Sequence, residues 1–507
     1  MATFILRRLV VSFFVLLAAT FVVYVLVANA GDPRTALLES TDPSRDAKIA
    51  ALTENLDLDT PVVPRYFGWL GGVAQCFVGQ CDLGTNINGA PVTGLLSVAL
   101  GSTLRLVLFA TVMAILFGVI VGIVTALRQY SGLDYSTTFL AFLFFSLPAF
   151  WIAVLLKQFL AIKFNSWLSD PVIPLWLTIV LAALGGLLAM ALIGGDRRQR
   201  MISLVGGAAV VAAVCVYLDV SKWFAQPGIG PVVMIVGSLA AAVGATALLS
   251  GFRYRRVLIA TLITAVVGII CSFSLGWLLD ISTAGTIIIL AIVTLAVSGA
   301  IGALVGGVLR SQAVKACMIT GFLSGALIFA DRLLQAVTGY SDKVRGILIA
   351  TIGSNTPNFS GDFWETTLDQ LGHLLLPSIV IVLISFATYT RYTRSSMLET
   401  MNQDYVRTAR AKGLTERTVV VRHAFRNAMI PVTTLMAIDF GAVIGGAVIT
   451  ETVFGWQGMG RLFTDALRIP DPNPVMGFFL VTGTAVVVFN MIVDILYGVL
   501  DPRIRTA

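Results

Sequence analysis

The chain has 507 residues, of which 57% are hydrophobic and 12% charged, and its formal net charge is +7. Soluble domains carry about 25% charged residues, so this composition excludes an ordinary soluble domain. Uncharged stretches of about 20 apolar residues recur along the chain, and each could cross a bilayer as a helix with its backbone bonded internally. The basic residues gather in the short loops between them, which is the positive-inside pattern rather than a nucleic-acid surface. The sequence predicts an all-α polytopic membrane protein.

The first apolar stretch follows Arg7 and Arg8 and ends in Ala28-Asn29-Ala30. This pattern is also typical of a cleaved signal peptide with a small-residue cleavage site. The stretch from Leu9 to Val27 is longer than the usual signal core of about 7–15 residues. We expect a retained transmembrane helix within residues 1–30.

About twelve transmembrane helices are predicted in all. Their approximate ranges are 9–29, 99–126, 136–162, 172–194, 201–219, 229–250, 256–279, 284–309, 313–336, 373–392, 430–453 and 475–499. If the amino terminus is inside, most basic loops fall on the same side of the membrane. The even count then places both termini in the cytoplasm.

Residues 31–98 are the first large hydrophilic segment and are predicted to form an extracytoplasmic domain. Cys76 and Cys81 lie in it, five residues apart, and could form a disulfide if this segment faces an oxidising exterior. The other three cysteines fall inside apolar stretches, where packing explains them. With only two histidines and no zinc-ligand spacing, we expect no metal site.

Residues 393–429 form the only sizeable loop predicted on the inside, and they are strongly basic. Two short helical stretches flank Gly413, and glycine can adopt the positive φ that a sharp turn between helices requires. Ordinary positive-inside charge would account for the arginines alone. Positive-inside charge does not explain why two helical stretches flank a glycine here.

Two carboxylates of the eleventh span are candidates for the translocation pathway. Asp439 lies well inside the span, and an ionised carboxylate there costs several kcal/mol unless it meets water or a polar partner. Asp439 therefore either faces a pathway or bonds another helix. Glu451, near the outer end of the same span, is the second candidate.

The inside loop resembles the "EAA" loop of ABC-importer permeases. Arg407, Thr408 and Ala409 fall at the E-A-A positions and Gly413 at the glycine. The usual glutamate and first proline are replaced by Arg407 and Arg426, which fits the branch that serves dipeptide and oligopeptide importers.

The resemblance to this peptide branch extends along much of the chain. It includes Arg7-Arg8-Leu9, Ala30-Gly31-Asp32-Pro33, Gly446 to Phe454, and Gly458-Met459-Gly460. It covers about residues 1–168 and 348–507, where it implies the six spans of a type I ABC-importer core. On this division, residues 1–30 are the first span, 31–98 the outside domain, 99–168 core spans 2–3, and 348–507 core spans 4–6 with the loop. Residues 169–347 are then an inserted module of six spans.

The resemblance implies a permease subunit of an ATP-driven importer for di- or oligopeptides. Its implied partners are a homologous second permease, two ATPase subunits and an extracytoplasmic peptide-binding protein. The implied ATPase-coupling residues are Arg407, Thr408, Ala409, Arg410, Lys412, Gly413, Leu414 and Arg417. None of the seven lysines follows a glycine as a P-loop requires, so ATP and Mg²⁺ are expected in the partners. We expect no cofactor and no catalytic residue in this chain.

Other functions remain open on the sequence. The same branch of permeases resembles carriers of nickel chelates and of glutathione. An ion-coupled secondary transporter would suit twelve spans, but it predicts two similar six-span halves, and none is visible. A membrane enzyme ranks last because the chain shows no cluster of acid, base and nucleophile.

Overall fold

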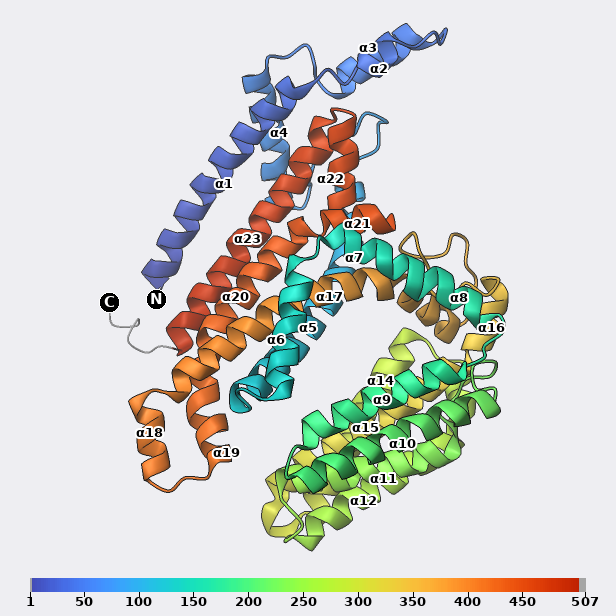
Figure 1. Ribbon diagram of the computed structural model, residues 1–507. Helices are drawn as coiled ribbons and strands as arrows, with labels where there is room; N and C mark the ends of the chain where they lie inside the picture. The colour runs from blue at the N-terminus through green and yellow to red at the C-terminus, as the bar shows by residue number, and fades with distance from the viewer. Residues whose placement is uncertain (1, 501–507) are drawn as a thin grey trace. The chain divides into compact units, whose positions relative to one another are not determined.

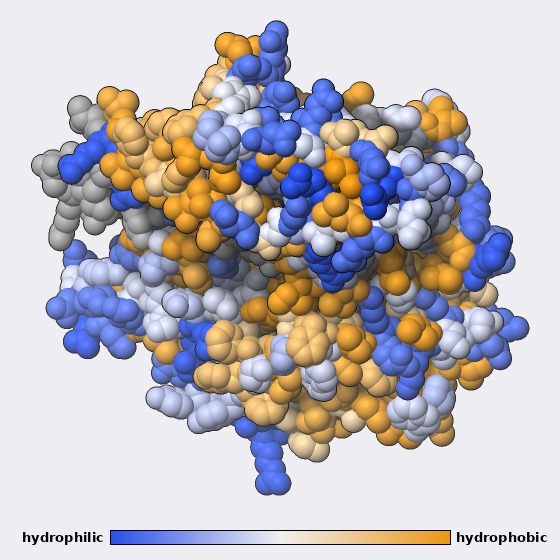
Figure 2. Space-filling view, turned by 90° about the horizontal axis from the view of Figure 1, so that it is seen from above, coloured by the Kyte–Doolittle hydropathy of each residue, from blue (hydrophilic) through white to orange (hydrophobic). Residues whose placement is uncertain are grey.

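The computed structural model describes the backbone of residues 2–500, and their side chains except at residues 2–5, 36, 437, 441–446, 493, 494 and 496–500. Over residues 2–500 the regular secondary structure is helical, with irregular segments such as residues 344–362 between helices, and the only β pairing described is one isolated bridge between Thr85 and Pro91. The all-α prediction is confirmed. Apolar side chains are exposed along many of the helices, and they cover much of the face in Figure 2. Such a surface suits contact with lipid.

Eleven helices in the described part of the chain are long and apolar enough to cross a membrane. They are Leu6–Ala30, Val92–Leu127, Ala149–Leu168, Leu175–Ile193, Arg197–Val220, Gly230–Leu249, Arg255–Ser274, Ala284–Val305, Gly307–Lys343, Phe363–Met401 and Pro472–Ile492. The protein is therefore a multi-pass membrane protein. The predicted span at 430–453 is the one without a counterpart here, and several of its side chains lie outside the described residues. That span, and the cytoplasmic placement of both termini, stay predictions; residues 501–507 are not described.

The chain divides into two compact units, which are visible in Figure 1. The first unit contains residues 1–158, 351–354 and 374–507, and the second contains residues 159–350 and 355–373. The module predicted at 169–347 lies within the second unit. That it is an insertion into a six-span core stays a prediction.

The first unit carries the outer domain and the basic loop. Its helices are α1 (Ala2–Ala30), α2 (Thr35–Leu38), α3 (Arg45–Asn55), α4 (Val62–Gln75), α5 (Val92–Leu127), α6 (Gly132–Ser146), α7 (Ala149–Leu156), the part of α17 (Phe363–Met401) after residue 373, α18 (Asp404–Ala411), α19 (Glu416–Thr418), α20 (Phe425–Gly446), α21 (Val448–Phe454), α22 (Met459–Arg468) and α23 (Pro472–Leu500). Helix α23 packs against α1 and α20.

The second unit consists almost entirely of apolar helices. They are α8 (Lys163–Leu168), α9 (Leu175–Ile193), α10 (Arg197–Val220), α11 (Gly230–Leu249), α12 (Arg255–Ser274), α13 (Gly276–Asp280), α14 (Ala284–Val305), α15 (Arg310–Gln335) and α16 (Val337–Lys343). Helices α11, α12 and α14 pack on α15, and α9 packs on α10. The α9–α10 crossing is close because Gly186 meets the backbone of α10: an added Cβ would lie 2.5 Å from the Leu204 carbonyl oxygen.

The predicted third span, 136–162, is wrong as a single helix. Helix α6 ends at Ser146, and α7 begins at Ala149 after Pro148. Proline lacks an N–H and disfavours helical geometry in the residue before it, and Leu147 is extended, with φ −82° and ψ 132°. The candidate span in this region is instead Ala149–Leu168, which includes a π-helical turn at Lys157–Ile162.

Cys76 and Cys81 form a disulfide just after α4. Around it, aromatic and aliphatic side chains of α1, α4, α5 and α23 make one buried cluster, which includes Tyr24, Tyr66 and Trp69. The disulfide closes a short loop within residues 31–98, and the cluster attaches α4 to the membrane helices.

A buried carboxyl group joins the outer segment to the start of α23. Asp471 is 4% exposed and accepts a hydrogen bond from the Ile87 N–H at 2.9 Å. Burial, opposed by this backbone hydrogen bond, raises the pKa of Asp471 to about 6. The folded chain therefore binds a proton at this carboxyl between about pH 4 and 6, where the unfolded chain does not.

We expect Asp471→Asn to change how stability depends on pH. The raised pKa means that the wild type gains stability as the pH falls from about 7 to 4 and is penalised above pH 6, by on the order of 3 kcal/mol. Asparagine has no charge to bury and keeps an acceptor for the Ile87 N–H. Thermal unfolding in lipid nanodiscs should show that the variant is stabilised relative to the wild type at pH 8 and that this advantage is nearly lost at pH 4. An equal difference at the two pH values would contradict the raised pKa.

Candidate coupling site

The predicted inside loop is a short helical hairpin at one end of the first unit. Helix α17 continues to Met401, α18 covers Asp404–Ala411, and α19 and a π-helical turn, Val419–Ala424, lead back into α20. Figure 1 shows α18 and α19 side by side beyond the ends of the long helices. We refer to residues 404–424 as the coupling hairpin.

The turn of the hairpin is made by Gly413. Its φ is +75°, the left-handed conformation that glycine adopts without strain, and its N–H bonds the Arg410 carbonyl oxygen at 2.9 Å. The N–H of Leu414 reaches back to Ala409 at 3.4 Å. These bonds end α18 as a glycine C-cap does. Thr415 then caps α19 by accepting the Thr418 N–H.

The hairpin has a small core of its own. Val406, Ala409 and Val419 are 0%, 5% and 0% exposed and pack together, with Met401 against them. In α18 the two buried positions are three residues apart, so one face turns inward and the polar face outward. The hairpin can therefore keep its shape while its outer face is in contact with another protein.

The outer face carries almost every residue that the sequence predicts to couple to an ATPase. Seven of the eight are exposed, and only Ala409 points inward: the exposed ones are Arg407, Thr408, Arg410, Lys412, Gly413, Leu414 and Arg417. The guanidinium group of Arg410 donates two hydrogen bonds to Glu416 across the turn, at 2.7 and 3.2 Å. These residues form a basic surface that includes the exposed apolar side chain of Leu414.

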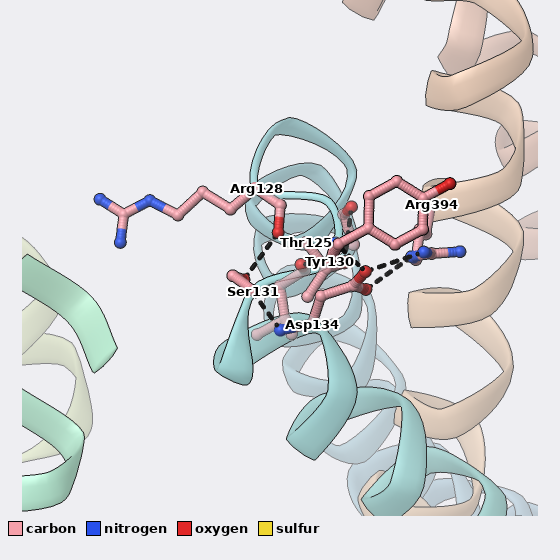
Figure 3. A network of polar contacts seen from close by, with 8 residues as sticks. Thr125, Arg128, Tyr130, Ser131, Asp134 and Arg394 are labelled. Atoms are coloured by element: carbon pink, nitrogen blue, oxygen red, sulfur yellow. Dashed lines mark hydrogen bonds and ion pairs between the residues drawn. The ribbon is translucent and has the colours of Figure 1, made fainter. Parts of the chain in front are cut away.

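An ion pair with a buried carboxylate supports the base of this hairpin. Arg394, in the last two turns of α17, donates two hydrogen bonds to Asp134 at 2.8 and 3.0 Å, and Figure 3 shows the two side chains meeting. Asp134 is 3% exposed and also accepts the Tyr130 N–H at 3.1 Å. Ser131 Oγ accepts the Asp134 N–H and donates to the Arg128 carbonyl oxygen. Burial acts to raise the pKa of Asp134, but the bonds from Arg394 and Tyr130 outweigh it and hold the pKa below its usual value.

Helices α5 and α17 cross closely above this ion pair. An added Cβ on Gly118 would lie 2.5 Å from Tyr389 Cβ, and one on Gly122 would lie 2.9 Å from the Thr390 carbonyl oxygen. The spacing Gly118-x-x-x-Gly122 puts both glycines on one face of α5, a common contact between membrane helices.

Apolar packing completes the base of the hairpin. Ala126 of α5 packs with Met397, Ala424 and Ala428, and Ser396 Oγ donates to the Ala428 carbonyl oxygen at 2.7 Å. The hairpin base, α17 and the α5–α6 turn thus form one packed body.

The two predicted pathway carboxylates have different surroundings. Asp439, in α20, is half-buried and accepts a hydrogen bond from Tyr389 Oη at 2.8 Å, so it bonds another helix. Glu451 is 0% exposed. One of its carboxylate oxygens accepts from Thr103 Oγ1 at 2.7 Å and the other from the Arg461 N–H at 3.1 Å. The Glu451 carboxylate ties α21 and α22 to α5.

Sequence reasoning missed Asp134, Arg394 and Thr103 as residues that hold the site. Asp134 and Arg394 are 260 positions apart, and each alone looks like a charge at a membrane edge. A signal was present, since both lie at the predicted cytoplasmic ends of spans, but pairing them requires knowing which helices are neighbours. Among the described residues, no group of three His, Cys, Asp or Glu side chains could hold a metal ion.

Two family models match the chain. Residues 264–506 match the inner membrane component of binding-protein-dependent transport systems, and residues 1–106 match the N-terminal region of such membrane components. The first match begins inside the predicted module at 169–347 and includes the whole coupling hairpin.

Curated relatives carry names of peptide transport proteins. The dipeptide transport system permease protein DppB of Escherichia coli (strain K12) is 49% identical over 138 residues, which is 27% of this chain and 41% of DppB. The oligopeptide transport system permease protein OppB of Mycobacterium tuberculosis (strain CDC 1551 / Oshkosh) is 39% identical over 155 residues, 31% of this chain and 48% of OppB. The oligopeptide transport system permease protein AppB of Bacillus subtilis (strain 168) is 24% identical over 508 residues and the full length of both.

The matches to DppB and OppB span less than half of each relative's length. They agree with the family models, with the helical fold and with the span-length apolar helices. The chain is a multi-pass cell-membrane protein that resembles the dipeptide and oligopeptide permeases among the inner membrane components of binding-protein-dependent transport systems.

Proposed function

We propose that this chain is the permease subunit of an ATP-driven importer of di- or oligopeptides, coupled through the hairpin at residues 404–424 to separate ATPase subunits. The observation that carries the proposal is the hairpin itself. It is a basic, exposed surface with its own buried core, and Asp134 and Arg394 anchor its base to the membrane helices.

The physical argument is one of force transmission. A partner that binds Leu414 and the surrounding arginines moves α18 as a unit, because Val406 and Ala409 pack against Val419 of the π-helical turn that follows α19. That movement reaches α20 directly, since α20 follows the hairpin without a break, and it reaches α17 through residues 402–403, which join α17 to α18. It reaches α5 and α6 through the Asp134–Arg394 pair. Nucleotide-driven closure of two ATPase subunits would then move the helices that line a pathway.

The remaining partners are part of the same proposal. A homologous second permease completes the pathway, and a binding protein delivers the peptide to the outer side, where residues 31–98 are available. ATP and Mg²⁺ are bound by the ATPase subunits, and this chain supplies no cofactor site and no catalytic residue.

Site-specific photo-crosslinking in cells that express the native partners tests the proposal. A benzophenone amino acid at position 414, which is 41% exposed, should crosslink a nucleotide-hydrolysing polypeptide. The same amino acid at Phe77, which is 90% exposed in the outer domain, is the matched control and should not. Uptake of labelled di- and tripeptides by a deletion strain, with and without the chain, then tests the substrate. No ATPase at position 414, or uptake that does not depend on the chain, would reject the function.

A further inference from the structure

Arg391 of α17 is a cation without an ion-pair partner among the described residues. Its guanidinium carbon lies 4.2 Å from the ring centroid of Phe145 and 5.6 Å from that of Phe142, both on α6. Its Nε is buried and forms no hydrogen bond within the described part of the chain. The two rings attract the cation, but they do not neutralise its charge.

The contacts on α6 place this guanidinium well inside the membrane. Arg394, one turn further along α17, meets Asp134 at the start of α6, close to the end of the α5 span. Phe142 and Phe145 follow Asp134 in α6, and the helical rise between them is about 12–16 Å. Helix α6 returns alongside α5 (Figure 1), and the hydrocarbon core of a bilayer is about 30 Å thick. The charge of Arg391 therefore lies deep in the core, where it is costly unless it meets water or a polar partner.

A polar face of α17 opens beside Arg391. Its side chains fall within about one third of the helix circumference, and none of them is buried. They are Ser385, Thr388, Arg391, Tyr392 and Ser395. On the opposite face Tyr389, Thr390 and Thr393 are buried against other helices. A face turned to lipid would be apolar, because a hydroxyl group loses its hydrogen bonds to water there, so this polar face suits water.

We propose that this face of α17 lines a water-filled pathway and that Arg391 binds a carboxylate group of the peptide that passes along it. This role rests on the proposed function and names the part of the substrate that Arg391 recognises. Nε is covered, so the two terminal nitrogens are the ones a ligand can reach, and they can donate in parallel to both oxygens of one carboxylate. Every peptide with a free carboxyl terminus carries such a group, whatever its sequence. A phospholipid phosphate does not reach this depth, because the headgroup stays at the interface.

Thiol labelling tests whether this face meets water, without any transport assay. Thr388→Cys leaves Arg391 in place and, in inside-out membrane vesicles that contain the assembled transporter, should react with a membrane-impermeant methanethiosulfonate at least tenfold faster than Leu184→Cys. Leu184 is the matched control, because it lies in the middle of α9 and is 57% exposed on an apolar helix. Labelling is counted above that of the unsubstituted chain, which has its own free cysteines. Equal rates at positions 388 and 184 would overturn the proposal.

Uptake of labelled trialanine and of its carboxyl-terminal amide tests the role of Arg391. Each is supplied at a concentration at which cells with the wild-type chain take it up measurably. Arg391→Gln should lower the ratio of acid to amide uptake about tenfold, because a charge-assisted hydrogen bond is lost only for the acid. The same binding protein delivers both peptides to both proteins, so its own preference cancels in this comparison.

Two further variants separate recognition from structure. Arg391→Lys keeps the charge and should retain most of the preference for the acid. Lys163→Gln removes another cation that lies on an aromatic ring, 4.6 Å from the centroid of Phe159, and should leave the ratio unchanged. An unchanged ratio in Arg391→Gln, or an equal loss of acid and amide uptake in both Arg391 variants, would overturn the role of Arg391 while peptide transport stands. No uptake of either peptide by the wild type would reject the proposed function itself.

Discussion

Replacing Gly413 by valine is expected to lower peptide uptake about tenfold. The φ of +75° costs a residue with a Cβ about 1–2 kcal/mol, and a β-branched residue more, so the competent turn is populated about 5–30 times less. An added Cβ would meet nothing within 4 Å, so the effect comes from the backbone conformation and not from a clash. Uptake of a labelled dipeptide and ATP hydrolysis, measured on the same reconstituted complex, give the loss of coupling directly.

Gly413→Asn is the matched control for this prediction. Asparagine tolerates the left-handed conformation better than other residues with a Cβ, so we expect uptake within about twofold of wild type. Wild-type uptake and coupling in Gly413→Val would show that the turn does not transmit force, and the proposed role of the hairpin would be abandoned.

Removing the Arg394 side chain is expected to destabilise the protein by about 2–3 kcal/mol. Asp134 would keep its charge, 3% exposed, after losing both guanidinium hydrogen bonds. Asp134→Ala should cost a similar amount, and the double variant less than the sum, because it leaves no unpaired charge. Thermal unfolding of the four proteins in nanodiscs completes the double-mutant cycle. Additive losses would mean that the pair contributes nothing as a pair.

An exposed ion pair on the hairpin serves as the control for this cycle. Arg407 and Asp404 lie 3.7 Å apart with side chains 69% and 99% exposed. Arg407→Ala should change the free energy of unfolding by less than about 1 kcal/mol, since exposed pairs contribute little.

The sequence predicted the membrane helices well because apolar length alone decides whether a segment can span a bilayer. It was less successful with their ends. The span predicted at 373–392 belongs to α17, which runs from Phe363 to Met401. Charged residues mark where the bilayer ends, but a helix continues beyond it wherever side chains such as Met397 find packing partners. Pro148 could have predicted the break, since proline interrupts a helix. The residues around it are uncharged, however, so the apolar stretch looked continuous.

The coupling hairpin could be predicted because its sequence pattern is local, whereas the ends of the long helices depend on packing partners elsewhere in the chain. Gly413 and the flanking polar and apolar residues lie within about 20 positions, and the periodicity of α18 alone places Val406 and Ala409 on its inner face. What braces the hairpin could not be predicted. The contact between Asp134 and Arg394 depends on the close crossing of α5 and α17, and the contact of Glu451 with Thr103 depends on how α21 lies against α5. Single-sequence patterns do not report which distant helices touch.

The outward placement of the hairpin's basic residues bears on how the protein could come to bind a different ATPase subunit. The shape of the hairpin is specified by its inward side chains Val406, Ala409 and Val419, whereas the residues proposed to contact an ATPase lie on the exposed outer face. Under the proposed function, substitutions at Arg407, Lys412 or Leu414 would alter which ATPase is accepted without removing a buried contact of the hairpin. Compatibility between subunits would then change on one small surface without repacking of the membrane domain.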